Sequence, residues 1–259
     1  MIVSQHMTPN PICVAPDFSV GAAMKIMDDC AIRHLPVLED GHLVGIVSDR
    51  DLLASQLTGD ERVSDLMHPW VITVSADDQI VSALVEAVTH QVGCLPVLDD
   101  GQLVGILTEM DLLGLYSRIA NAPERKRSID PPVSAIARLE AVTIPPSTTS
   151  EEASELCHHK GFRHLLVMQD NDLVGILSDR DLRASSGAGL KPSTPVDQLM
   201  SDQVQAIAPS ESLSSAAARM VEFKISALPV VSDNRSPGII TCSDLLDYGL
   251  AAFRDSQSN

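Results

Sequence analysis

Apolar and polar positions alternate along this chain in short segments that predict strands and helices. Near the beginning, the apolar run at residues 12–14 predicts a strand. The apolar positions within residues 20–27 recur at helical spacing, so they predict a helix with one buried face. Asp17 or Ser19 is suited to cap that helix, because both side chains accept hydrogen bonds from free backbone N–H groups.

The next apolar segments predict a hairpin followed by a second helix. Residues 34–38 and 42–47 read as two strands that are joined by a tight turn at residues 39–41, where Asp-Gly readily adopts positive φ. Ser48 follows the second strand and is suited to cap a helix over residues 49–56. The predicted order of elements is therefore β-α-β-β-α, an α/β unit.

The same order recurs four times at constant spacing. Each copy opens on a valine, carries a glycine 42 residues later, and has an aspartate six residues after that glycine. The valines are Val3, Val63, Val133 and Val196, and the glycines are Gly45, Gly105, Gly175 and Gly238. The same spacing between these three positions in four copies is not expected by chance, so the chain consists of four structural repeats.

Each repeat is a short unit of about sixty residues with one apolar sheet face, so we expect repeats to pair. The longest spacing between copies falls between the second and third, in a stretch rich in proline and charge that predicts a linker. The predicted boundaries are 1–58 for repeat 1, 59–118 for repeat 2, 119–132 for the linker, 133–190 for repeat 3 and 191–259 for repeat 4, which gives modules 1–118 and 133–259.

Composition narrows the classes of partner. The formal net charge of −17 disfavours nucleic acid and anionic membrane surfaces. The five cysteines form no C-x-x-C pair and fall at unrelated offsets, which indicates mostly buried free thiols in a reducing cytosol. Since there is no secretory signal and no apolar run of about eighteen residues, we expect a cytoplasmic protein without membrane insertion.

The recurring Gly-x-x-Ser/Thr-x-x-Asp element carries the candidate chemistry. It places a hydroxyl and a carboxylate at a helix N-terminus, where unpaired backbone N–H groups favour an anion. The hydroxyl can cap the helix or donate to a phosphate or ribose oxygen, and the carboxylate can accept two hydrogen bonds from a vicinal diol. The same residue types begin ordinary helices, so a single copy would favour a simple cap. Four copies in register favour ligand binding at some of them.

Three longer motifs resemble cystathionine-β-synthase (CBS) domains. They are Met-Thr-Pro at 7–9, Arg-His-Leu-Pro-Val at 33–37, and Gly-Ile-x-Ser-Asp-Arg-Asp-Leu at 45–52, and the resemblance runs from Val3 to about Phe253. It implies that two repeats pair about a pseudo-twofold axis into a Bateman module, that adenosine-containing ligands bind in clefts between repeats, and that two modules form a flat disc. We therefore expect a stand-alone CBS protein with two modules and four candidate clefts.

The resemblance also implies roles for residues. The ribose would bind Asp51, Asp111, Asp181 and Asp244, beside the hydroxyls of Ser48, Thr108, Ser178 and Thr241. The adenine would lie against Val14, Ile46, Val74, Ile106, Ile144, Ile176, Ile207 and Ile239, most of which would be core residues even without a ligand.

Phosphates require cations in a chain this acidic, and only two of the repeats offer them at these positions. The candidates are Arg33, His34 and Arg50 in repeat 1 and Arg163, His164 and Arg180 in repeat 3, whereas Met110 and Ser243 replace the second arginine in repeats 2 and 4. We therefore expect about one good nucleotide site in each module. Ion pairing of Arg50 and Arg180 with nearby aspartates is an equal alternative.

A catalytic role is not expected, because the sequence has no Gly-x-Ser-x-Gly, Walker or His-Glu-x-x-His motif. The Cys157-His158-His159 run suits no single metal ion, because consecutive helical side chains diverge. We expect a regulatory sensor of AMP, ADP or ATP that needs no cofactor and signals to an unidentified partner protein. A scaffold with vestigial clefts, or a subunit responsive to S-adenosylmethionine or Mg²⁺, remains an alternative. The sequence leaves the ligand, the number of occupied clefts and homodimer formation open.

Overall fold

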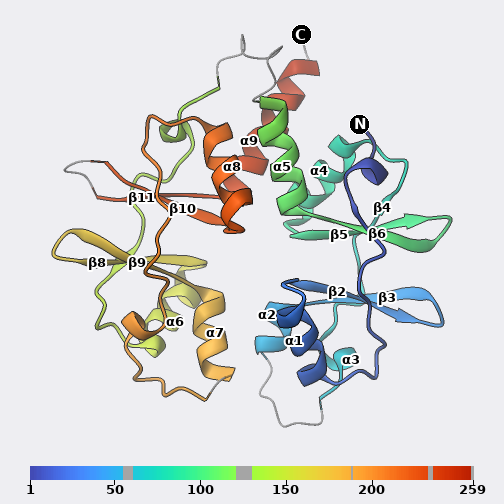
Figure 1. Cartoon of the computed structure of the whole chain (residues 1–259), viewed down its shortest axis with the longest axis horizontal. Helices are drawn as coiled ribbons and strands as arrows, with labels where there is room; N and C mark the ends of the chain where they lie inside the picture. Colours follow the sequence, from blue (N-terminus) through green and yellow to red (C-terminus); the bar gives the residue numbers. More distant parts are fainter. Residues whose placement is uncertain (55–60, 121–129, 188, 233–235, 258–259) are drawn as a thin grey trace. The chain divides into compact units, whose positions relative to one another are not determined.

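The computed structural model describes residues 1–54, 61–120, 130–187, 189–232 and 236–257 (Figure 1). The charged part of the predicted linker lies outside the described residues. The chain divides into two compact units, Met1–Leu112 with Gly249–Asn259 and Leu113–Tyr248. Each unit is described below by itself.

The predicted β-α-β-β-α order is present in the first two repeats, with a short helical turn before each. Repeat 1 contains η1 (Val3–Gln5), β1 (Thr8–Pro9), α1 (Val20–Asp29), β2 (His34–Glu39), β3 (His42–Ser48) and α2 (Asp49–Ala54). Repeat 2 contains α3 (Val63–Leu66), β4 (Val74–Ser75), α4 (Ile80–His90), β5 (Cys94–Asp99), β6 (Gln102–Thr108) and α5 (Glu109–Ala120). Helix α5 thus continues into the first two residues of the predicted linker at 119–132.

Repeat 3 follows the same plan, and repeat 4 follows it except that its first strand is reduced to one parallel bridge between Ile207 and Val230. Repeat 3 contains η3 (Val133–Ala135), β7 (Thr143–Ile144), α6 (Ser150–Lys160), β8 (His164–Gln169), β9 (Asp172–Ser178) and α7 (Asp179–Gly187). Repeat 4 contains η4 (Val196–Gln198), α8 (Leu213–Phe223), β10 (Ala227–Val230), β11 (Gly238–Thr241) and α9 (Cys242–Gln257). The mixed α/β class expected from the sequence is confirmed.

Local side-chain chemistry explains where these elements begin and turn. Ser19 is the N-cap of α1, and its hydroxyl oxygen accepts a hydrogen bond from the backbone N–H of Ala22 at 3.3 Å. The β2–β3 turn places Asp40 at φ 50° and Gly41 at φ 80°, the left-handed conformation that Asp-Gly tolerates. The predicted cap and the predicted turn are both confirmed.

The first predicted strand is shorter than expected. Within residues 12–14, only Val14 pairs, through one parallel bridge to Val37 of β2. Pro11 has no backbone N–H to donate, so it cannot extend the Val14 bridge into a longer ladder toward the N-terminus. The strand β1 lies earlier instead, and it pairs with β6 of repeat 2 in the order β1-β6-β5-β4.

Each repeat is packed around a small apolar core. In repeat 1, Val20, Ala23 and Met27 of α1 pack with Leu35 and Val37 of β2, and all five side chains are buried. The β2–β3 hairpin covers α1 and α2 in Figure 1. The apolar positions that predicted the helix therefore face this core.

Two repeats are joined by exchanging their opening segments. In the first unit, Thr8 of repeat 1 pairs with Ile106 of repeat 2, and His68 of repeat 2 pairs with Ile46 of repeat 1. The second unit repeats the exchange, with Arg138 against Ile239 and Ser201 against Ile176. The last strand of each repeat therefore adjoins a segment that comes from its partner repeat.

This exchange explains the glycine of the repeat. A Cβ on Gly105 would overlap the side chain of Met7 in the opening segment of the partner repeat, and a Cβ on Gly45 would overlap Met67. Gly238 lies against the backbone of Arg138 instead of a side chain. The glycine is thus needed because the partner segment passes directly over the strand.

Candidate functional site

The serine or threonine and the aspartate of every repeat form one reciprocal hydrogen-bonded cap. The backbone N–H of Ser48 donates to Asp51 Oδ2 at 2.8 Å, and its hydroxyl donates to the same oxygen at 2.6 Å. The N–H of Asp51 in turn donates to Ser48 Oγ at 3.3 Å. The pairs Thr108–Asp111, Ser178–Asp181 and Thr241–Asp244 form the same three bonds.

This cap assigns different tasks to the two carboxylate oxygens. Oδ2 closes the first turn of the helix, and Oδ1 takes no part in the cap. The hydroxyl proton of Ser48 is already donated to Asp51, so this group acts as the cap that the sequence allowed. Oδ1 is the carboxylate oxygen that remains for a ligand or for a neighbouring side chain.

The cap also favours the charged form of Asp51. Burial opposes ionisation of this carboxyl, but the hydrogen bonds from Ser48 and His68 outweigh burial and lower the pKa of Asp51 below its ordinary value. The group is therefore a fixed anion at neutral pH. A fixed carboxylate is oriented before any ligand arrives.

The second oxygen of two of these aspartates contacts a basic side chain of the partner repeat. His68 Nε2 lies 3.1 Å from Asp51 Oδ1, and an Arg138 guanidinium nitrogen lies 3.9 Å from Asp244 Oδ1. His68 and Arg138 each stand five residues after the first valine of their repeat. Neither residue was predicted from the sequence, although their shared offset was a signal that could have identified them.

The other two repeats carry hydroxyls at this offset. Thr8 stands beside Ile106 in the strand that leads to Asp111, and Ser201 stands beside Ile176 in the strand that leads to Asp181. Within the described part of the chain, no ion pair is recorded for Asp111 or Asp181. The four repeats therefore differ in the residue that stands five positions after the opening valine.

The predicted phosphate-binding arginines lie next to these caps. The backbone carbonyl of Arg33 accepts a hydrogen bond from Asp49 at 2.9 Å, and that of Arg163 accepts one from Asp179 at 3.0 Å, so each arginine adjoins a helix N-terminus. Arg50 is half-buried in the first turn of α2, and Arg180 is exposed in the first turn of α7. Their role in phosphate binding stays a prediction.

The two predicted histidines face the partner repeat. The imidazole of His34 packs against Gly93, and His164 Nε2 lies 3.4 Å from the hydroxyl oxygen of Ser226, the residue equivalent to Gly93. Burial lowers the pKa of His34, and this effect outweighs the nearby carboxylate of Asp49. His34 is therefore suited to offer a ligand a hydrogen bond and not a positive charge.

The predicted adenine-lining residues separate into two groups. Val14, Val74, Ile144 and Ile207 are buried in the cores of their repeats. Ile46, Ile106, Ile176 and Ile239 lie on the last strand of each repeat, two residues before the capping hydroxyl, and Ile46 and Ile176 are half-buried. The second group is the one that pairs with the partner segment.

Other candidate chemistry does not assemble into a site among the described residues. No group of three or more His, Cys, Asp or Glu side chains there is arranged to hold a metal ion. Cys94, Cys157 and Cys242 are buried, as expected, whereas Cys30 is exposed. Burial raises the pKa of Cys157 to about 11, which leaves it as a thiol. No described helix has the length and apolar character needed to cross a membrane.

Each of the four repeats matches a known family. The family model of the CBS domain matches residues 3–57, 63–118, 133–187 and 196–251. Two uncharacterized proteins of Methanocaldococcus jannaschii are similar over almost the whole chain: MJ1404 is 27% identical over 95% of it, and MJ1225 is 26% identical over 92% of it. The present chain spans 61% of the length of MJ1404 and 94% of the length of MJ1225.

Solved structures share the fold. The crystal structure of MJ1225, described as a proposed archaeal homologue of γ-AMPK, aligns with a TM-score of 0.79 at 23% identity and covers 96% of this chain and 100% of that chain. An uncharacterized conserved protein from Pyrococcus horikoshii aligns with a TM-score of 0.68 at 24% identity over 96% of this chain and 99% of that one. The fold is therefore shared with these archaeal proteins.

Proposed function

This chain belongs to the CBS-domain family, and from that premise we propose that it is a non-enzymatic regulatory protein that binds an adenosine-containing nucleotide. The ligand would be AMP, ADP or ATP, held between paired repeats, and its binding would be passed to a partner protein. The observation that carries this proposal is the reciprocal cap, which orients a carboxylate and leaves Oδ1 outside the cap, at the end of a strand that pairs with the partner segment.

The site offers each part of a nucleotide a matching group. Oδ1 of the aspartate can accept hydrogen bonds from the ribose diol, and the capped carboxylate needs no reorientation to do so. The isoleucine before the cap offers apolar contact to adenine. Arg50 and Arg180, in the first turns of their helices, are near enough to the caps to offset phosphate charge.

The exchange of opening segments supports a route for the signal. A ligand on Asp111 would also touch the opening segment of repeat 1, because that segment lies beside Ile106. Binding would then alter how firmly the two repeats are held together. A partner protein would respond only if the ligand has unequal affinity for two arrangements of the repeats.

Thermal stability in the presence of ligands tests this proposal. The purified protein, freed of co-purified ligand, is heated with AMP, ADP, ATP, S-adenosylmethionine or Mg²⁺. A ligand at a hundred times its dissociation constant stabilises the folded state by about 2.7 kcal/mol, which is readily measured. We expect stabilisation by at least one adenine nucleotide.

A matched set of variants distinguishes the proposed site from nonspecific binding. Asp→Asn at positions 51, 111, 181 and 244 together keeps an oxygen that can accept the cap hydrogen bonds but removes the carboxylate charge. Asp40→Asn changes the same charge in the β2–β3 turn and serves as the control. Loss of the nucleotide effect in the fourfold variant alone supports the site. A shift that persists there rejects it, and a response to S-adenosylmethionine or Mg²⁺ alone rejects the adenine nucleotide as ligand.

A further inference from the structure

The four clefts fall into two classes according to the residue that the partner repeat presents to Oδ1. In the Asp51 and Asp244 clefts this residue is basic, and it already contacts the carboxylate oxygen that a ribose would need. In the Asp111 and Asp181 clefts it is Thr8 or Ser201, whose side chains are exposed and short. Each unit contains one cleft of each class.

We propose that the residue at this offset selects the nucleotide site, so that AMP binds more tightly at Asp111 and Asp181 than at Asp51 and Asp244. This inference rests on the proposed nucleotide binding and assigns it to particular clefts. His68 and Arg138 act as internal competitors, since each already contacts Oδ1, the oxygen that the ribose would use. The tighter sites then lie in repeat 2 of the first unit and in repeat 3 of the second unit.

The backbone around His68 makes the competition unavoidable. Its N–H donates to the Ile46 carbonyl at 2.8 Å, and its carbonyl accepts from the Ile46 N–H at 3.1 Å. With the backbone held by these two bonds, only rotation of the imidazole can clear Oδ1. His68 Nε2 lies 3.1 Å from Oδ1 and already takes one of its acceptor directions, so a diol that uses both directions must displace the imidazole.

The size of the effect follows from exposure. The His68 side chain is 66% exposed and that of Asp51 is 20% exposed, so the displaced imidazole regains water while the carboxylate changes one partner for another. Exposed pairs of this kind contribute modestly to stability, which corresponds to a roughly two- to fivefold change in affinity. Arg138 is 62% exposed and its contact with Asp244 is longer, so its effect is expected to be the smaller.

Reciprocal swaps within the first unit test the proposal by isothermal titration with AMP. His68→Thr gives the Asp51 cleft the residue of the Asp111 cleft, and Thr8→His does the reverse. We expect His68→Thr to tighten the weaker binding phase about two- to fivefold and Thr8→His to weaken the tighter phase by a similar factor. Both side chains are exposed and both aspartate caps stay intact, so folding is preserved in either variant.

Single Asp→Asn variants assign the phases. Asp111→Asn should remove the tighter phase of the first unit, and Asp51→Asn should leave it in place. If Asp51→Asn removes the tighter phase, or if His68→Thr weakens AMP binding, the selection inference is wrong while nucleotide binding stands. If the wild-type protein binds no AMP, ADP or ATP at all, the proposed function fails and this inference fails with it.

Discussion

The glycine in the last strand of each repeat provides a quantitative test of the exchanged arrangement. Replacing Gly238 with alanine adds a Cβ that would lie 2.5 Å from the carbonyl oxygen of Arg138 and 3.2 Å from the Cα of Leu139. Both atoms belong to the backbone of the partner segment, which is paired to Ile239 and cannot rotate away. One of the two strands must therefore move.

Overpacking of this kind costs about 1–3 kcal/mol. Replacing Gly45 should cost less, because its Cβ would meet the Sδ of Met67, near the end of a flexible side chain. Gly21 in α1 has no neighbouring atom within 4 Å, so Gly21→Ala should stabilise slightly, by up to about 1 kcal/mol. The expected order of stability is Gly21→Ala, wild type, Gly45→Ala and then Gly238→Ala.

Melting curves followed by far-ultraviolet circular dichroism measure this order. A loss of 1 kcal/mol lowers the Tm of a domain of this size by about 2–4 °C. Because the two units can melt separately, the transition affected by Gly238→Ala should differ from the one affected by Gly45→Ala. The reasoning fails if Gly238→Ala melts with the wild type, since the partner segment then does not press on that strand.

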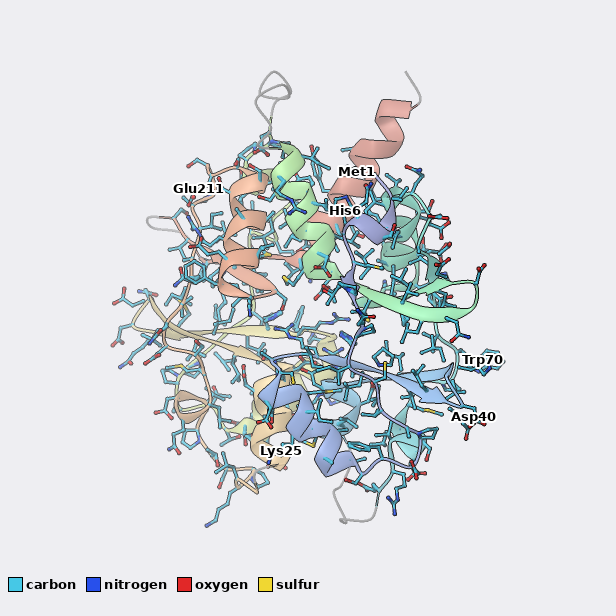
Figure 2. All side chains as sticks on the ribbon, turned by 45° about the vertical axis from the view of Figure 1, so that its right-hand side comes forward. Met1, His6, Lys25, Asp40, Trp70 and Glu211 are labelled. Carbon is cyan, nitrogen blue, oxygen red and sulfur yellow. The ribbon has the colours of Figure 1, made fainter. Side chains whose placement is uncertain are left out.

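Three further results are expected. Thr149 caps α6 and exchanges hydrogen bonds with Glu152, so Thr149→Ala should cost about 1 kcal/mol in urea unfolding; no change would show that the cap contributes nothing. The pKa of Asp51 is lowered in the folded state, so its charge stabilises the fold above the unfolded pKa, and this contribution is lost as the pH falls through the folded pKa. The Tm difference between wild type and Asp51→Asn should therefore shrink below about pH 4. A difference that stays constant with pH would contradict this assignment. Trp70, the chain's one tryptophan, is 91% exposed and points outward in Figure 2, so acrylamide should quench its fluorescence almost as strongly in the native as in the unfolded protein, whereas protection in the native state would show that it is covered.

Local rules were sufficient for the parts of the fold that depend on neighbouring residues. The Ser19 cap and the turn at Asp40 follow from side-chain chemistry within four residues, and both were predicted from the sequence. The Ser48–Asp51 pair was predicted as a cap or a ligand site, and the structure resolves the cap. These features need no knowledge of the partner repeat.

Contacts between repeats were not predictable in the same way. The approach of His68 to Asp51 depends on the exchange of opening segments, which no local pattern specifies. The packing of His34 against Gly93 likewise joins residues of two repeats, and it places a histidine proposed as a phosphate ligand against the partner repeat. Only a comparison of equivalent offsets in all four repeats would have drawn attention to position 68.

The exchanged opening segments make a pair of repeats resemble a domain-swapped homodimer whose two subunits are joined in one polypeptide. Thr8 completes the sheet of repeat 2, and His68 completes the cleft of repeat 1, so each half carries a part that only the other half can use. An isolated repeat would leave both its segment and the strand that receives one without a partner, and two copies would meet that need by trading segments with each other. A substitution in the opening segment of one half is therefore expected to alter the sheet or the site of the other half.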